Sequence, residues 1–374
     1  MKWLCLLALT FGCAGSKSSS EMPASGGNGG AGGAANVGGA TSASGVPNPP
    51  GPSNVPVPTG TSANLHVLPW AGFKAAVSYT FDDSQPSQIQ HWPELSATGV
   101  RMTFYINSIN NWIPNYDASF KEAIAQGHEI GNHTAHHCHP EQLNGADLVN
   151  CKAGLPTVEE EIDSCSDYIK SPLGQKDVWT FAYPFGDLGY TAAAKTRFML
   201  ARGVFTGTIS PTGTVDPFNL PIIGHTGSPT VAGGDDVSLF NADIDTAASR
   251  GDWVIFLYHS VLPTPDDWYA GESIATVTGS IEYARGLSGG VWLDSVVNIG
   301  AYWLGARLLT AATPTVAGSE STWTWTLPDH FPPGRIVRVS VDGGALSQGG
   351  QRLTWDPHGF YEVSLDAGSL TWAP

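Results

Sequence analysis

The sequence predicts an α/β fold of about seven strands, the size of one (β/α) barrel, followed by a small antiparallel β module. Strand-like apolar runs alternate with helical patterns between residue 71 and residue 309, which indicates parallel strands joined by crossover helices. After residue 313, apolar and polar residues alternate strictly, which is typical of antiparallel strands. The first of these regions is long enough to bury one large core.

The N-terminal part has the features of an export signal and a tether. Lys2, a short apolar run and Cys13 predict a signal peptide over residues 1–13, of the lipoprotein type, with simple secretion as the alternative. The apolar run is too short to span a bilayer. Residues 14–62 are nearly all Gly, Ser, Ala, Asn and Pro, so we expect a disordered linker there. We therefore expect a monomer outside the cytoplasm, lipid-anchored at Cys13 in the cell envelope or extracellular.

A catalytic domain is expected over residues 63–310. Helices are expected between its strands, including residues 119–127 and 192–203, each closed by a glycine. Folds of this class carry their chemistry at the C-terminal ends of the strands. The segments with a strand pattern are residues 75–81, 101–106, 128–133, 178–183, 203–208, 252–258 and 290–296.

A C-terminal β domain is expected over residues 311–374. It contains four tryptophans, Trp323, Trp325, Trp355 and Trp372. These rings would suit a carbohydrate-binding surface, but a small module also needs large aromatic side chains for its own core. We favour the core.

The net charge indicates the class of partner, and the cysteines indicate a disulfide. The net charge of −16 argues against nucleic acid, which requires clustered Lys and Arg, and favours a neutral or cationic substrate. An exported protein permits disulfides. We expect Cys138 to pair with Cys151. Cys165 lies on the apolar face of a helix that begins with a capping box of Thr157 and Glu160, so we expect a buried free thiol.

Polar side chains follow four of the predicted strands. "SYTFDDS" ends the first strand with Asp82 and Asp83, two carboxylates that need a cation or a proton to share an apolar strand end. "EIGNHTAHH" follows the third, "FAYPFG" the fourth, and "FLYHS" a later strand with His259. All four lie at the end of the fold where chemistry is expected.

Two imidazoles and one carboxylate suit a divalent transition metal with an open coordination position, most simply zinc. A spacing of four places His133 and His137 on one face if the chain turns helically after the strand. His136 and His139 would then face elsewhere. For these two and for His128 we expect surface or local hydrogen-bonding roles.

The segments "TFDD", "HTAHH", "YPFG" and "LYH" resemble, in order and approximate spacing, the motifs of the polysaccharide deacetylases, the family four carbohydrate esterases. The resemblance spans roughly residues 70–305 and implies a distorted (β/α) barrel. It further implies ligands, a catalytic base, a general acid, and a pocket for the oxyanion and the acetyl methyl group. The ligands are Asp83, His133 and His137, the base is Asp82, the acid is His259, and the pocket residues are Tyr183, Pro184, Phe185 and Leu257.

The chain departs from the family in two motifs. Many relatives carry an arginine two residues before the proline of the third motif, where it orients the catalytic aspartate, and this chain has Ala182. The fourth motif of the family is also not recognisable between residues 203 and 226. Asp187 or Asp216 are the candidates for the missing supporting role, and nothing in the sequence selects between them.

The resemblance implies a metal-dependent hydrolase that removes acetyl groups from an N-acetylated glycan, with Zn²⁺ or else Co²⁺ or Ni²⁺. The alternatives are an esterase for O-acetyl groups on a xylan-type polymer, a catalytically decayed glycan-binding protein, and a non-haem iron oxygenase. An oxygenase needs two histidines and a carboxylate, but neither a second aspartate nor His259. Aromatic platforms for the sugar are expected at Trp112, Trp268 and Tyr269.

Overall fold

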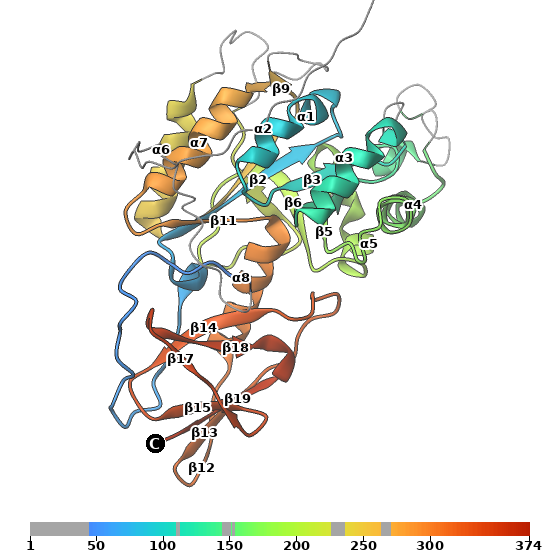
Figure 1. The fold of residues 1–374 in the computed structure, drawn as a ribbon. Coiled ribbons are helices and arrows are strands. Elements are labelled where there is room, and N and C mark those ends of the chain that lie inside the picture. The colour runs from blue at the N-terminus through green and yellow to red at the C-terminus, as the bar shows by residue number, and fades with distance from the viewer. Residues whose placement is uncertain (1–44, 110–112, 144–150, 152–153, 226–235, 263–270) are drawn as a thin grey trace, which may run out of the picture. The chain divides into compact units, whose positions relative to one another are not determined.

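The computed structural model describes residues 45–109, 113–143, 151, 154–225, 236–262 and 271–374 (Figure 1). These residues belong to one compact unit, Gly38–Pro374. The predicted signal peptide, most of the predicted linker, and the predicted platforms Trp112, Trp268 and Tyr269 lie outside the described residues. Within the described ranges, no helix combines the length and the apolar character needed to cross a bilayer.

A parallel sheet closes into a barrel, which confirms the predicted fold class. The strands follow one another around the ring in chain order from β2 to β7, and β8 pairs with β2. Ile223, just after β7, closes the ring, because its N–H donates to Ile255 O at 2.8 Å and its carbonyl accepts from Leu257 N at 3.0 Å. The barrel strands are β2 (Ala75–Asp82), β3 (Thr103–Ile106), β4 (Glu129–Asn132), β5 (Thr180–Ala182), β6 (Leu200–Thr206), β7 (Leu220–Ile222) and β8 (Trp253–Tyr258).

Helices cover the outside of the barrel, with α3, α4 and α5 on one side and α6 and α7 on the other (Figure 1). The helices of the described residues are α1 (Pro86–Gln90), α2 (Trp92–Ala97), α3 (Ile113–Ala125), α4 (Val158–Lys170), α5 (Thr191–Lys195), α6 (Val237–Arg250), α7 (Ile274–Gly286) and α8 (Val296–Ala311). Short 3₁₀ turns are η1 (Pro69–Gly72), η2 (Pro140–Gln142), η3 (Pro184–Gly186), η4 (Leu188–Tyr190) and η5 (Leu365–Ala367). Three further strands are β9 (Val261–Leu262), β10 (Glu272–Ser273) and β11 (Val291–Leu293).

Side chains along β2 alternate between the core under the outer helices and the interior of the barrel. All eight residues of β2 are buried. Val77, Tyr79 and Phe81 belong to the core cluster that also includes residues of α6 and α7. Successive side chains of a strand point to opposite faces, so Thr80 and Asp82 face the barrel interior. The strand therefore delivers a carboxylate to the inside of the barrel at its C-terminal end.

Three expectations for the barrel elements are wrong. The predicted helix over residues 192–203 ends at Lys195, and β6 begins at Leu200, because pairing with β5 and β7 outweighs the helix-favouring composition. β7 was not predicted because Pro221 stands in its centre, which argues against an interior strand. The predicted last strand is shorter, and β11 pairs with the beginning of β2 outside the ring.

The C-terminal module consists of two antiparallel sheets. One has the strand order β1-β14-β18-β17 and the other β12-β13-β19-β15-β16. β1 (Leu65–Val67), which we expected in the catalytic domain, is an edge strand of this module because it pairs with β14. The other strands are β12 (Thr315–Ala317), β13 (Glu320–Thr324), β14 (Ile336–Val341), β15 (Ala345–Gln348), β16 (Gln351–Arg352), β17 (Trp355–Asp356), β18 (Phe360–Ser364) and β19 (Ser369–Ala373).

The end of the predicted linker is held by a buried arginine. Arg338 of β14 is fully buried, and its guanidinium donates to the carbonyls of Val46, Pro47 and Ala71 and forms an ion pair with Glu362. The expectation of disorder is therefore wrong for residues near position 46. A buried guanidinium needs several acceptors, and the backbone of this segment supplies them.

The tryptophans of the module serve mainly as core. Trp323 and Trp372 are buried in a cluster that extends through α8 to the barrel strands. Trp325 and Trp355 are half-buried, and their indole N–H groups donate to Leu365 O and Val55 O.

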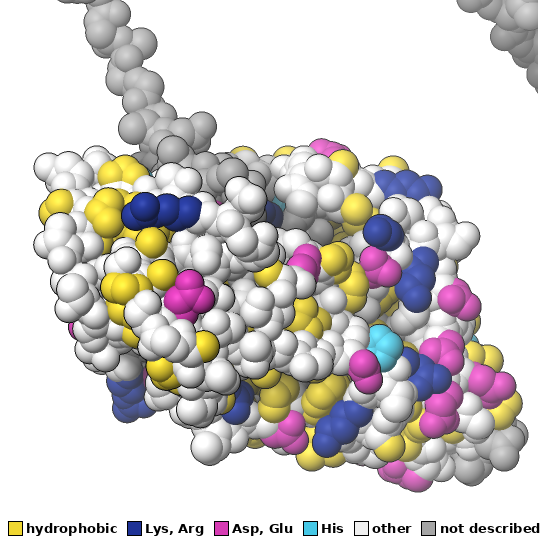
Figure 2. Space-filling view, turned by 90° about the horizontal axis from the view of Figure 1, so that it is seen from below, with side chains coloured by type: hydrophobic (Ala, Val, Ile, Leu, Met, Phe, Trp, Pro, Cys, Tyr) yellow, Lys and Arg dark blue, Asp and Glu magenta, His cyan; other side chains and the backbone are white. Residues whose placement is uncertain are grey.

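On the face of the molecule in Figure 2, basic side chains lie in small separate groups, several of them beside acidic ones.

His128 predicts a specific loss of stability in acid. It is buried, its Nδ1 accepts from the N–H of Met102 at 3.0 Å, and burial together with Arg101 lowers the pKa of His128 to about 4. A histidine with a depressed pKa in the folded state destabilises the protein as pH falls from its unfolded value, about 6.5, towards 4. His128→Gln should weaken the decline in the free energy of unfolding over this range, by up to about 1.4 kcal/mol per pH unit.

Urea unfolding between pH 4.5 and 7 measures this effect. The matched control is His66→Gln, because the side chain of His66 is 60% exposed. Equal pH dependence of the wild type and His128→Gln would contradict the assignment.

Candidate metal and catalytic site

The loops after β2, β4, β5 and β8 bring the predicted site residues around one cavity of about 350 Å³ at the C-terminal ends of the strands. Apolar side chains of β6, β7 and β8 form part of its wall. The predicted residues among its lining are Asp82, His133, His137, Tyr183, Phe185, Leu257 and His259.

Two adjacent carboxylates reach the site because the chain leaves strand geometry between them. In a regular strand, Asp82 and Asp83 would point to opposite faces. The backbone instead has φ of 68° at Asp83 and 54° at Ser84, in the left-handed region that side chains other than glycine rarely adopt. Both aspartates are buried. Such strain persists only where surrounding contacts enforce it, and it is common at functional sites.

Asp83, His133 and His137 form a group able to hold a metal ion. One ligand atom from each of the three lies within 4.8 Å of the others. Nε2 of His133 and Nε2 of His137 lie 3.3 Å and 3.4 Å from Oδ1 of Asp83. Nδ1 of His133 lies 2.8 Å from the carbonyl of Ala182, which can only accept, so Nδ1 carries a proton. Nε2 faces the site and could bind a metal ion once its own proton is released.

The protonation of this group fits a cation site. Burial alone would raise the pKa of Asp83, but the hydrogen bond with His133 and the nearby histidines hold it well below its usual range. Burial and His133 lower the pKa of His137 to about 4, so this imidazole is neutral at neutral pH. Burial opposes protonation of His133, but the carboxylates of Asp82 and Asp83 outweigh it and raise the pKa. One ionised carboxylate and two imidazoles are a suitable donor set for a divalent transition metal.

The histidine loop is not the helical turn we expected. After β4, Thr134 and His137 have φ of 67° and 56°, and no helix is assigned between residues 133 and 137. Side-chain hydrogen bonds shape the loop, because Thr134 N donates to Asn132 Oδ1 and His137 N donates to Thr134 Oγ1. The buried Asn132 amide in turn donates to Ile162 O of α4. The spacing of four does bring the two imidazoles together, with ring centres 4.6 Å apart.

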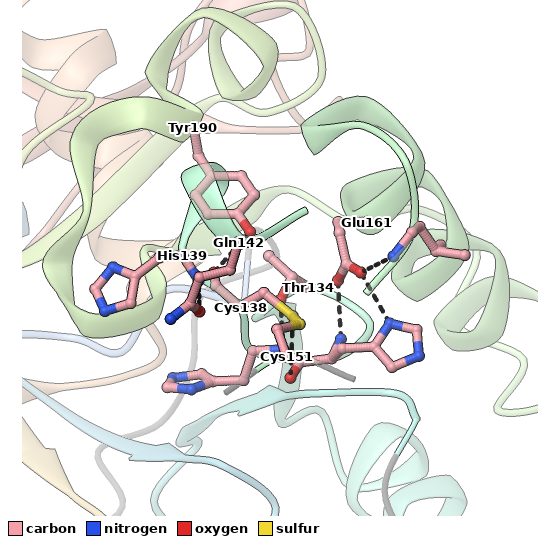
Figure 3. The surroundings of a disulfide bond; sticks show 10 residues. Thr134, Cys138, His139, Gln142, Cys151, Glu161 and Tyr190 are labelled. Atoms are coloured by element: carbon pink, nitrogen blue, oxygen red, sulfur yellow. Dashed lines mark hydrogen bonds and ion pairs between the residues drawn. A yellow bond between two sulfur atoms is a disulfide. The ribbon is translucent and has the colours of Figure 1, made fainter. Parts of the chain in front are cut away.

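A disulfide and a buried glutamate brace this loop (Figure 3). Cys138 is bonded to Cys151, and Cys165 is free and buried, as predicted. Glu161 of α4 is fully buried and accepts from His136 N at 2.9 Å, while its second oxygen lies 2.8 Å from His136 Nδ1. His136 therefore contacts α4 and not the metal-ligand group. The role of Glu161 could not be predicted from the sequence, because a run of three glutamates at the start of a helix is usually exposed.

His139 and Asp187 form a separate pair. His139 Nδ1 lies 2.9 Å from Asp187 Oδ2, and its ring stacks on Phe185 with ring centres 4.1 Å apart. Asp187 is therefore not the partner of Asp82. Asp216 is exposed and accepts from Phe218 N, so it does not take that role either.

The missing arginine is replaced from the neighbouring strand. Arg202 of β6 is fully buried and forms an ion pair with Oδ2 of Asp82. Its guanidinium lies 5.0 Å from the ring centre of Tyr105, and its Nη1 donates to Gly203 O. Ala182 and Arg202 are register partners in adjacent strands, so their side chains point the same way. Asp82 therefore does have a cationic neighbour, although Ala182 occupies the motif position where many relatives carry the arginine.

The remaining predicted residues surround these groups. His259 Nε2 lies 3.6 Å from Asp83 Oδ2. Leu257 is buried and lines the cavity. Phe185 has φ of 56° and a ring that is 43% exposed, and among the described residues its N–H has no hydrogen-bond acceptor. Oδ1 of Asp82 is likewise buried without a partner in the described part of the chain, because Arg202 contacts the other oxygen. One donor and one acceptor are thus available at the cavity.

The fold and this group of residues define a (β/α) barrel with clustered carboxylates and imidazoles, able to hold a metal ion, at its C-terminal end. Residues 72–201 match the family model named polysaccharide deacetylase, which confirms the resemblance seen in the motifs. The matched segment includes Asp82, Asp83, His133 and His137, while Arg202 and His259 lie beyond it.

Three known proteins are similar to part of the chain. The uncharacterized protein YlxY of Bacillus subtilis (strain 168) is 31% identical over 94 residues, which is 25% of this chain and 25% of that protein. A putative polysaccharide deacetylase of Mycobacterium smegmatis is 15% identical with a TM-score of 0.44, over 71% of this chain and 98% of the other. The peptidoglycan deacetylase PdaC of Bacillus subtilis is 14% identical with a TM-score of 0.40, over 60% and 90%.

The three-residue group predicts which side chains control metal content. Asp83→Ala, His133→Ala and His137→Ala should each reduce bound zinc from about one ion per chain to nearly none, since each removes a ligand. His136→Ala and His139→Ala should keep it, because these side chains contact Glu161 and Asp187. Elemental analysis of dialysed, folded protein measures the result. Full zinc retention in His137→Ala would contradict the site.

The ion pair between Arg202 and Asp82 leads to a prediction about turnover. Arg202→Met should lower turnover by about 10- to 100-fold, because it removes the cation that contacts one oxygen of Asp82. Arg202→Ala combined with Ala182→Arg should recover part of the loss, since both positions face Asp82 from adjacent strands. Steady-state rates of the wild type and the variants measure this effect. Turnover in Arg202→Met equal to that of the wild type would refute the role of Arg202.

Proposed function

We propose that this protein is a metal-dependent hydrolase that removes acetyl groups from an N-acetylated polysaccharide. The observation that supports this best is the position of Asp82, His133, His137 and His259 around one cavity at the C-terminal ends of the barrel strands, with the carboxylate of Asp83 beside the three imidazoles. The family match of residues 72–201 supports the same class of reaction. An acetyl group is small and neutral, which agrees with a cavity wall that includes Leu257.

The metal would be held by Asp83, His133 and His137. A divalent ion bound there would polarise the acetyl carbonyl and make a water molecule more acidic. We propose Zn²⁺, with Co²⁺ or Ni²⁺ as substitutes, because imidazole and carboxylate ligands suit all three.

The proton-transfer roles follow from which atoms are available. Oδ1 of Asp82 accepts the proton of the attacking water, while Arg202 holds Oδ2 through an ion pair. His259 donates a proton to the departing amine nitrogen as the carbon–nitrogen bond breaks. The N–H of Phe185 donates to the carbonyl oxygen as negative charge develops on it. The wall at Leu257 contacts the methyl group of the acetyl.

An assay of acetate release from different acetylated polymers would identify the class of substrate. Metal-reconstituted protein should release acetate from N-acetylglucosamine oligomers more readily than from O-acetylated xylan. Preference for the xylan would favour the O-acetyl esterase. Release from neither, with binding to one of them, would favour a decayed glycan-binding protein. We further propose that the chain is exported as a monomer and lipidated at Cys13, with simple secretion as the alternative.

Catalysis and metal binding should separate in two variants. Asp82→Asn and His259→Ala should keep near-normal zinc content, because neither side chain is assigned as a ligand. Each should lose a factor of about 10²–10⁴ in turnover, the usual contribution of a positioned acid or base. Metal analysis and initial rates on the same preparations measure both properties. Full activity in His259→Ala would mean that the proton of the leaving group comes from elsewhere.

A further inference from the structure

Gln88, a residue outside the recognised motifs, connects the two proton-transfer residues. It lies in α1 and is fully buried. Its single side-chain nitrogen donates to the backbone carbonyl of Asp82 at 2.6 Å and to that of His259 at 2.9 Å. Asp82 ends β2, and His259 directly follows β8. One amide group thus holds the chain at both residues that flank the cavity.

The contact lies where regular strand pairing stops. β2 and β8 pair from Ala76↔Trp253 to Phe81↔Tyr258, and the next pair along the ladder would be Asp82 with His259. The backbone turns away at Asp83, so the carbonyls at this point need donors from elsewhere. Gln88 supplies both, which a side chain with one donor hydrogen could not do. The adjacent Ser87 reinforces the contact, because its Oγ accepts from Val261 N at 2.8 Å.

The hydrogen bonds constrain the direction of the catalytic side chains. A carbonyl that is held in place fixes the rotation of its peptide, and the peptide after Asp82 leads into the strained turn at Asp83. The peptide of His259 is fixed in the same way on the other side of the amide. We infer that Gln88 is a positioning residue that sets the separation and orientation of Asp82 and His259 across the cavity. This inference rests on the proposed function, because it takes these residues as base and acid.

Gln88→Met tests the inference, since it removes both donors at similar side-chain length. It should lower kcat by about 10²-fold with little change in KM, because small misplacements of reacting groups have effects of this size. The matched control is Gln348→Met in the β module, where one amide nitrogen also donates to two carbonyls, Ser364 O and Ser369 O, both at 2.9 Å. Both variants should lose thermal stability, and only Gln88→Met should lose kcat. Retention of kcat in Gln88→Met would overturn the inference.

A double-mutant comparison separates positioning from general destabilisation. In the His259→Ala background, Gln88→Met should reduce kcat by a clearly smaller factor than in the wild type, because part of its effect acts through His259. An equal factor in both backgrounds would overturn the inference.

A readout independent of activity keeps the two proposals distinguishable. The imidazole signals of His259 in NMR spectra, identified by their loss in His259→Ala, should shift in Gln88→Met and stay in place in Gln348→Met. If the wild type releases acetate from no substrate, the proposed function fails, and this comparison still decides the positioning role. Unchanged His259 signals in Gln88→Met would refute it.

Discussion

The constraint on which this site depends is the burial of two adjacent carboxylates at the end of one strand. An ionised carboxylate inside a protein is unfavourable unless cations or donors lie beside it. Arg202 of β6 meets this need at Asp82, and the imidazoles after β4 and β8 meet it at Asp83. The compensating groups come from three other strands, so the carboxylates are stable only when the barrel is closed. Fold and site are therefore coupled by electrostatics.

The opposite end of the barrel contains a matching polar anchor. Glu129, at the start of β4, is buried and accepts from the hydroxyls of Thr103 and Thr180 and from the N–H of Val297. A carboxylate at the N-terminus of α8 is favoured by the free N–H groups and the dipole of the helix. α8 then packs between the barrel and the β module, and Gly305 leaves room there for a side chain of η5. The module is thus joined to the barrel by a continuous apolar core.

Sequence patterns predicted the parts of the site that carry chemistry in side chains at strand ends. Asp82, His133 and His259 each follow an apolar run, so their position at the cavity could be predicted from the class of fold. The shape of the loops could not be, because φ at Asp83 and His137 depends on contacts with residues far along the chain. The roles of Gln88 and Glu161 could not be predicted for the same reason. Their roles are hydrogen bonds to backbone groups, and such bonds leave no periodic signal in the sequence.

Arg202 shows most clearly why position in space and position in sequence are different properties. A buried carboxylate such as Asp82 needs a cation beside it, and a side chain on either of two adjacent strands can place one there. Ala182 and Arg202 are paired in register, so exchanging the strand that carries the arginine preserves the ion pair and removes the residue from its motif. The segment that matches the family model ends at Ala201, one residue before the replacement. An apparently incomplete motif in such a barrel is therefore best judged by what the neighbouring strand presents to the same carboxylate.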